Sequence, residues 1–255
     1  MRSDRPPLFN FRDFGGQQSR FGGKVRTDRL FRSGQFSADS PRVLEVISAF
    51  DFELIVDLRE PTERVEAPSN LPERYARRIV AHDGDSARTA PHLALLREET
   101  LNPEGIARYY ETLYASLPFD PLYRAQFVDI FRRLATINGR VLIHCALGKD
   151  RTGLLCALLL DCLGVNRADI LADYLRSSRA PGFESWRDKI FEWSRQRHGR
   201  EVSPGTADAL LDARADYLTR AFAQIEQQSG SVAAYLTQLR VDSDVLRDVR
   251  AQLIE

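Results

Sequence analysis

The stretch Val141–Gly153 constrains the fold and the chemistry of this chain more than any other. The apolar run Val141–Ile143 leads into His144 and Cys145, Arg151 follows six positions after the cysteine, and a leucine-rich segment with helical spacing begins directly afterwards. This order predicts a strand, a tight loop and a helix. Because the backbone N–H groups of such a loop and the positive end of the helix point at one place, the stretch predicts an anion-binding loop.

The side chains of this loop suit the chemistry of phosphate esters. Cys145 would lie at the base of the loop, where the positive field favours the nucleophilic thiolate. Arg151 can hold two oxygens of a phosphate at once, Thr152 can donate a hydrogen bond to the sulfur, and Gly148 relieves steric limits where the backbone curves. We therefore expect the sulfur to attack phosphorus and give a phosphocysteine that water hydrolyses.

Such a reaction needs a general acid that protonates the leaving oxygen. Asp150 is the first candidate because it lies inside the loop beside Arg151. Asp57, which follows the predicted strand, is a second candidate, although it could equally pair with Arg59 and serve as a supporting residue. Asp83 and Asp85 are further candidates, and the residues alone leave this choice open.

The motif His144-Cys145-x-x-Gly148-Lys149-Asp150-Arg151-Thr152-Gly153 resembles the signature loop of cysteine-dependent protein tyrosine phosphatases, in the form found in a bacterial subfamily. Asn10–Gly16, Leu30–Gly34, Val56–Arg59 and Ala172–Leu175 are similar to that subfamily, in its order. The resemblance implies a phosphatase that acts on phosphotyrosine in proteins, with Cys145 as nucleophile, Arg151 as phosphate clamp and Asp150 as acid. It also implies that the phosphate is bound by the loop residues Ala146, Leu147, Gly148, Lys149, Asp150 and Arg151. The residues that support this site would be His144, Thr152 and Asp57.

Several other functions are compatible with parts of this pattern. Lys149 would add a positive charge, and the pair Gly148-Lys149 also resembles the loop of phosphoinositide phosphatases, but Ala146 stands where those enzymes tend to carry a second lysine. Dual specificity, and a module that binds phosphoproteins without turnover, are further alternatives. A sulfurtransferase of the rhodanese type fits less well, because the spacing to Arg151 suits phosphate better.

The length and composition indicate one globular domain, residues 1–255, and the expected reaction needs neither a cofactor nor a metal. Of the 255 residues 43% are hydrophobic, and 36 basic residues balance 36 acidic ones, so no net charge favours nucleic acid or an anionic membrane. His82 and His92 lack the spacing of metal ligands.

The three cysteines show no disulfide pattern, and Cys156 and Cys162 are expected to pack in the core. This use of cysteine fits a reducing compartment. The sequence shows neither a signal peptide nor a membrane span, so we expect a cytoplasmic protein, and leave export by another route open.

The apolar patterns predict an α/β fold with a small, mostly parallel central sheet flanked by helices. The strands are expected at 30–32, 54–56, about 77–81 and 141–143, and the helices at 37–50, 106–117, 122–137, 152–163, 166–178, 183–198 and 207–227, with two more within 231–255. Residues 182–212 mix aromatic and basic residues between two breaks and resemble the helical lid of that phosphatase subfamily. A fixed helical hairpin is the alternative for this segment.

Overall fold

A central five-stranded sheet organises the molecule, and a computed structural model describes it over residues 8–84, 102–198 and 201–255. The strands are β1 (Arg12–Asp13), β2 (Leu30–Ser33), β3 (Leu54–Asp57), β4 (Ile79–Val80) and β5 (Val141–His144), in the order β1-β2-β5-β3-β4. Of the four pairings between these strands, that of β1 with β2 is antiparallel and the other three are parallel. The predicted small and mostly parallel sheet is therefore confirmed, with β1 as a short strand that the sequence patterns did not indicate.

The register of the three inner strands brings their carboxyl ends to one edge of the sheet. Ser33 of β2 and Asp57 of β3 both pair with His144, the last residue of the central strand β5. Ligands of open α/β folds bind at this edge. The residues that follow β5 therefore start from the position where such folds place their sites.

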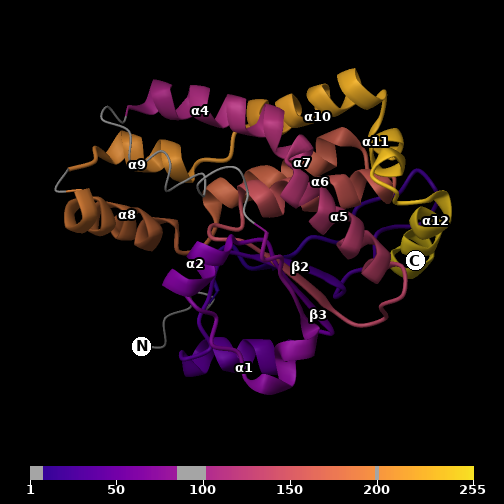
Figure 1. Cartoon of the computed structure of the whole chain (residues 1–255), viewed down its shortest axis with the longest axis horizontal. Helices are drawn as coiled ribbons and strands as arrows, with labels where there is room; N and C mark the ends of the chain where they lie inside the picture. Colours follow the sequence, from indigo (N-terminus) through magenta and orange to yellow (C-terminus); the bar gives the residue numbers. More distant parts are fainter. Residues whose placement is uncertain (1–7, 85–101, 199–200) are drawn as a thin grey trace.

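Helices cover the two faces of the sheet unequally (Figure 1). The helix α1 (Pro41–Phe50) covers one face, where a small apolar core forms around residues such as Phe31, Ile47 and Phe52. The other face carries the larger core and most of the helices, namely α4 (Pro103–Ser116), α5 (Pro121–Leu134), α6 (Asp150–Cys162), α7 (Arg167–Leu175), α10 (Ala215–Ser229), α11 (Val232–Gln238) and α12 (Ser243–Leu253). The helix α2 (Pro61–Glu66) follows β3.

The helix α6 is the buried centre of the larger core. Twelve of its residues are buried, as its leucine-rich sequence predicts, and Gly164 follows it with a φ of +81°. A side chain on Gly164 would be strained in that conformation, so glycine suits the end of the helix. Because the body of α6 is fixed on all sides, its first turn has a defined position at the edge of the sheet.

The predicted helix at 207–227 is wrong, because the structure divides it. The helix α9 (Pro204–Leu211) ends before an extended link at Asp212–Arg214, and α10 begins at Ala215. In the link, Ala213 N–H donates to the hydroxyl of Ser178 at 2.6 Å instead of to a helical carbonyl. Pro204 starts α9, since proline is tolerated in the first turn and Ser203 caps Thr206 N–H.

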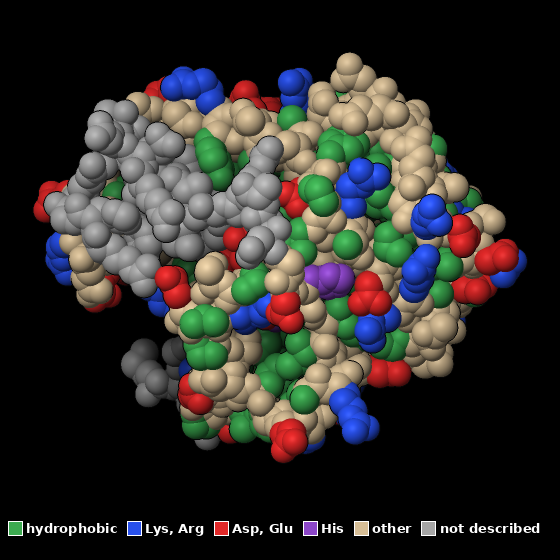
Figure 2. Space-filling view, viewed as in Figure 1, with side chains coloured by type: hydrophobic (Ala, Val, Ile, Leu, Met, Phe, Trp, Pro, Cys, Tyr) green, Lys and Arg blue, Asp and Glu red, His purple; other side chains and the backbone are tan. Residues whose placement is uncertain are grey.

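The charges of the molecule are interspersed on the face shown in Figure 2. This distribution agrees with the equal numbers of acidic and basic residues in the sequence. No helix in the described part of the chain is long and apolar enough to span a membrane. Two residues considered above, Asp85 and His92, lie outside the described residues.

Candidate active site

The predicted loop lies at the carboxyl edge of the sheet, between β5 and α6. Cys145 directly follows the strand, and Asp150 and Arg151 form the first turn of the helix. Their exposed fractions are only 2%, 7% and 4%. The structure thus brings the three residues of the expected reaction together on one short and largely buried segment.

The carbonyl groups of this loop bond to donors outside it. Ala146 O accepts from Gln35 N–H at 2.9 Å, Gly148 O accepts from Asn10 Nδ2 at 2.9 Å and from Arg32 Nη2 at 2.8 Å, and Leu147 O accepts from Asn10 Nδ2 at 3.3 Å. No described residue accepts a hydrogen bond from the N–H groups of residues 146–149. A backbone with bonded carbonyls and unbonded N–H groups is suited to holding an anion.

Gly148 is required where it stands. Its φ is +64°, and a Cβ at this position would lie 2.2 Å from the carbonyl oxygen of Ser33. Both the conformation and the close approach to β2 exclude a side chain. The loop therefore packs its backbone directly against the neighbouring strand.

A buried network of charged side chains from β1, β2 and α7 contacts the loop at Gly148. Asp173 of α7 accepts from Arg32 Nη1 at 2.7 Å and from Arg12 Nε at 2.8 Å. Burial opposes the charge of Asp173, but Arg32 and then Arg12 outweigh it and lower the pKa of Asp173. Arg32 and Asp173 belong to stretches that resemble the phosphatases, but the sequence analysis assigned no role to either. For Arg32, a charged residue inside an apolar strand was the available signal.

Arg151 is fixed by a carboxylate that the sequence analysis did not identify. Glu63 of α2 accepts from Arg151 Nη2 at 2.8 Å and also from Nη1, which additionally donates to Leu58 O at 3.2 Å. Burial opposes the charge of Arg151, but Glu63 outweighs it and raises the pKa of Arg151 well above its ordinary value. The guanidinium is therefore charged and held in one orientation. The signal for Glu63 was weak, because an acidic residue in a short charged helix is common.

Asp150 lies beside a pair of buried tyrosines. Tyr114 Oη donates to Asp150 Oδ1 at 2.7 Å, and Tyr174 Oη lies 2.7 Å from Tyr114 Oη. Both tyrosines are buried. Asp150 is thus held at the N-terminus of α6 by Tyr114 of α4, which in turn contacts Tyr174 of α7.

Backbone carbonyls outside the loop hold the ammonium of Lys149. Its Nζ donates to Leu210 O at 2.8 Å and to Asp212 O at 2.9 Å, and it lies 4.0 Å from the ring centroid of Tyr110. Burial lowers its pKa. The backbone of Lys149 is part of the loop, whereas its side chain, expected to add charge to the phosphate site, contacts the link that follows α9.

Asp57 forms an ion pair. Its carboxylate accepts from Arg59 Nε at 2.9 Å and from Arg59 Nη2 at 2.7 Å, and its Oδ2 lies 3.8 Å from His144 Nε2. Burial would raise its pKa, but His144 and Arg59 lower it to about 2. A carboxylate in this state has no proton to donate near neutral pH, so Asp57 is suited to the supporting role rather than to that of the acid. Burial also lowers the pKa of His144 to about 4, so this histidine is neutral.

Two other expectations differ from the geometry. The hydroxyl of Thr152 has no hydrogen-bond partner among the described residues, so the expected bond to Cys145 is not formed. The side chain of Asp83 is 92% exposed and pairs with Arg64, which places it at the surface.

Cys156 and Cys162 are buried free thiols, and burial raises their pKa values to about 12 and about 11. In the described ranges, no group of three histidine, cysteine or acidic side chains could hold a metal ion.

Comparison with known proteins extends the resemblance over the whole chain. Residues 4–255 match the model of a tyrosine phosphatase family. A protein of Cupriavidus necator that is named as a tyrosine-protein phosphatase is 33% identical over 94% of this chain and 85% of its own. The triple specificity protein phosphatase PtpB of Mycobacterium tuberculosis is 27% identical over 98% of both chains, and a tyrosine-protein phosphatase of Nostoc commune is 28% identical over 90% of this chain and 75% of its own. The chain therefore belongs to the tyrosine phosphatase family.

Proposed function

We propose that the protein hydrolyses phosphotyrosine in proteins through a phosphocysteine on Cys145. One observation carries the proposal: Cys145 opens a loop whose carbonyls bond outward, and this loop leads into an arginine that Glu63 fixes. The unbonded N–H groups and the guanidinium together suit the charge of a phosphoryl group in transfer. Membership of the tyrosine phosphatase family supports the same reaction.

The reaction proceeds in two steps. In the first, the Cys145 thiolate forms a bond to phosphorus, the bond from phosphorus to the tyrosine oxygen breaks, and Asp150 gives its proton to that oxygen. In the second, water attacks the phosphocysteine, Asp150 takes a proton from the water, and the thiolate leaves with release of inorganic phosphate. Arg151 and the N–H groups of residues 146–151 stabilise the charge on the phosphoryl oxygens in both steps.

The position of Lys149 supports a monoester with few additional charges. Two backbone carbonyls hold its ammonium, so this cation contributes less to binding further phosphates than its place in the sequence suggests. A phosphoinositide stays the second candidate substrate, because the pair Gly148-Lys149 resembles the loop of phosphoinositide phosphatases. Of these two candidate substrates, we propose phosphotyrosine.

The helices α8 (Phe183–His198) and α9 form the proposed lid. Most described side chains of α8 are exposed or half-buried, whereas α9 buries four residues. Ser178 joins the start and the end of this segment, because its hydroxyl donates to Asp212 Oδ1 at 2.6 Å and accepts from Ala213 N–H. A lid with fixed ends and a weakly packed α8 would open mainly through α8.

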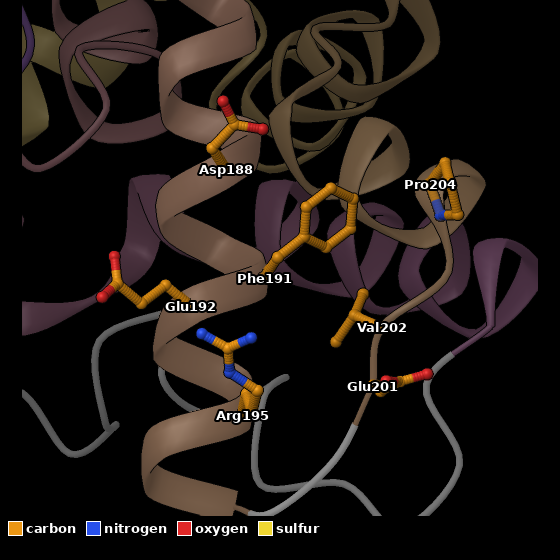
Figure 3. Close-up of a pocket in the computed structure, with 7 residues that line it drawn as sticks. All are labelled: Asp188, Phe191, Glu192, Arg195, Glu201, Val202 and Pro204. Carbon is orange, nitrogen blue, oxygen red and sulfur yellow. The ribbon is translucent and has the colours of Figure 1, made fainter.

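A hollow lies between α8 and the segment at the start of α9 (Figure 3). Its lining mixes both charges with apolar groups and consists of Asp188, Phe191, Glu192, Arg195, Glu201, Val202 and Pro204. None of the loop residues lines it. This hollow therefore belongs to the proposed lid, and its presence agrees with incomplete packing there.

The test is the hydrolysis of an aryl phosphate, a phosphotyrosine peptide and a phosphoinositide by the wild type, Cys145→Ser and Asp150→Asn. We expect no turnover with Cys145→Ser, and with Asp150→Asn a loss of about a hundredfold or more for poor leaving groups. Cys162→Ser is the matched control, since this thiol is buried at the other end of α6. Binding of the phosphopeptide without turnover by the wild type would make the protein a binding module and refute the proposal.

A further inference from the structure

Four buried tyrosines surround the carboxylate of Asp150 and the ammonium of Lys149. They come from three helices and are Tyr110 and Tyr114 of α4, Tyr174 of α7 and Tyr217 of α10. The rings of Tyr110 and Tyr114 both contact that of Tyr217, with centroids 5.2 Å and 5.6 Å apart. Of these four hydroxyls, that of Tyr114 bonds to Asp150.

The direction of the hydrogen bonds in this cluster follows from counting protons. Burial, and then the charge of Asp150, raises the pKa of Tyr114 and of Tyr174 well above the ordinary value, so both phenols keep their protons. Tyr114 has one proton, and its bond to Asp150 Oδ1 uses it. The 2.7 Å contact between the two hydroxyls must then be a donation from Tyr174 to Tyr114.

Lys149 forms an ion pair with Asp150 but no close hydrogen bond to it. Its Nζ is 3.6 Å from Asp150 Oδ1, beyond a normal hydrogen bond, and it already donates to Leu210 O and Asp212 O. Among the described residues no donor bonds to the other oxygen, Oδ2, and the Asp150 side chain is 10% exposed. When Asp150 is protonated, the proton therefore belongs on Oδ2, because Oδ1 accepts from Tyr114.

We propose that Tyr114 is a positioning residue: its hydroxyl accepts a hydrogen bond from Tyr174 and donates one to Asp150 Oδ1. This bond fixes the carboxyl group so that Oδ2 is the oxygen that transfers the proton. Oδ2 then gives its proton to the leaving oxygen in the first step and takes a proton from water in the second. A rotation of the carboxyl group that exchanged the two oxygens would break the bond from Tyr114. This inference rests on the proposed role of Asp150 as general acid.

The experiment measures how strongly the rate depends on the leaving group. A nitrophenol leaves without help from an acid, whereas a phenol needs its proton. For Tyr114→Phe we expect kcat/KM, which reports the first step alone, to fall about tenfold with phenyl phosphate and by less than about twofold with nitrophenyl phosphate. Tyr174→Phe should give the same pattern with a smaller loss, and it carries the test if Tyr114→Phe does not fold.

Tyr110→Phe is the matched control. It removes a buried hydroxyl from the same helix and cluster, but that hydroxyl donates to Leu210 O at 2.9 Å and not to Asp150. A merely structural role of the cluster would make all three variants lose activity equally on both substrates. Such a result, or an unchanged leaving-group dependence in Tyr114→Phe and Tyr174→Phe, overturns the inference.

A double variant separates this inference from the function on which it rests. In an Asp150→Asn background, Tyr114→Phe should cause no further loss with phenyl phosphate, because the group that it positions is already absent. An additive loss refutes the role of Tyr114 even when the protein is a phosphatase. A wild type without phosphatase activity, or an active Cys145→Ser, refutes the proposed function itself.

Discussion

At the scale of single residues, the proposed role of Arg151 as phosphate clamp requires that its guanidinium keeps one orientation. Glu63 supplies that constraint through both terminal nitrogens. Glu63→Gln removes the charge but nearly keeps the shape. We expect kcat/KM for an aryl phosphate to fall at least about tenfold and the free energy of unfolding to fall by about 3 kcal/mol, because a buried guanidinium loses its counter-charge.

The control for this prediction is Glu66→Gln, on the exposed side of the same helix α2. It removes the same charge without touching Arg151, so activity should change less than twofold, which is about 0.4 kcal/mol. Steady-state kinetics and urea unfolding of both variants provide the test. Equal effects of the two substitutions would show that the net charge of α2 matters, and not the contact with Arg151.

His144 gives the stability of the protein a defined dependence on pH. Burial lowers its pKa from 6.5 to about 4, so below pH 6.5 the unfolded chain binds a proton that the folded protein does not. The stability is therefore fully present above pH 6.5 and is lost as the pH falls towards 4. Between pH 7 and pH 5 we expect the free energy of unfolding to fall by about 2 kcal/mol. Asp57, with a pKa of about 2, stays ionised throughout this range.

Urea unfolding at pH 7 and pH 5 tests this dependence. His144→Gln should remove most of the difference between the two values. His82→Gln, which changes a partly exposed histidine, should retain it. A wild type equally stable at both values would contradict the neutral and buried state of His144.

At the scale of elements, α8 and α9 differ in how firmly they are held. Burial in α8 is slight, whereas α9 packs Thr206, Ala207, Leu210 and Leu211 into the protein. We expect the backbone amides of α8 to exchange with deuterium at least about a hundredfold faster than those of β5, and those of α9 to lie between. Hydrogen exchange measured by mass spectrometry on the full chain would show this. Protection of α8 as strong as that of β5 would favour the fixed hairpin over the lid.

The elements also show what the sequence could and could not predict. The strand, loop and helix around Cys145 follow from a local pattern, and so does the buried helix α6. The break between α9 and α10 has no proline or glycine, and it depends on Ser178, which lies 35 positions away from Ala213. Glu63 and Arg32 escaped assignment for a similar reason, since their partners are 88 and 141 positions distant. Local propensity carries no information on such contacts.

At the scale of the whole molecule, one buried network joins segments from both halves of the chain. Asn10 and Arg12 come from the N-terminal segment, Arg32 from β2 and Asp173 from α7, and they meet beneath Gly148. The two arginines share Asp173 as their carboxylate. The shape of the loop before α6 therefore depends on contacts with segments from both halves of the chain and not on the loop sequence alone.

Asp173→Asn tests this dependence, because it leaves two buried guanidinium groups without their shared counter-charge. We expect the free energy of unfolding to fall by about 3–5 kcal/mol, and kcat/KM to fall in the protein that remains folded, since Arg32 then holds Gly148 O less firmly. Asp216→Asn is the control: it breaks the exposed pair of Asp216 with Arg214 and should cost less than about 1 kcal/mol. Urea unfolding and steady-state kinetics distinguish the two. A stable and fully active Asp173→Asn would mean that the loop keeps its shape without the network.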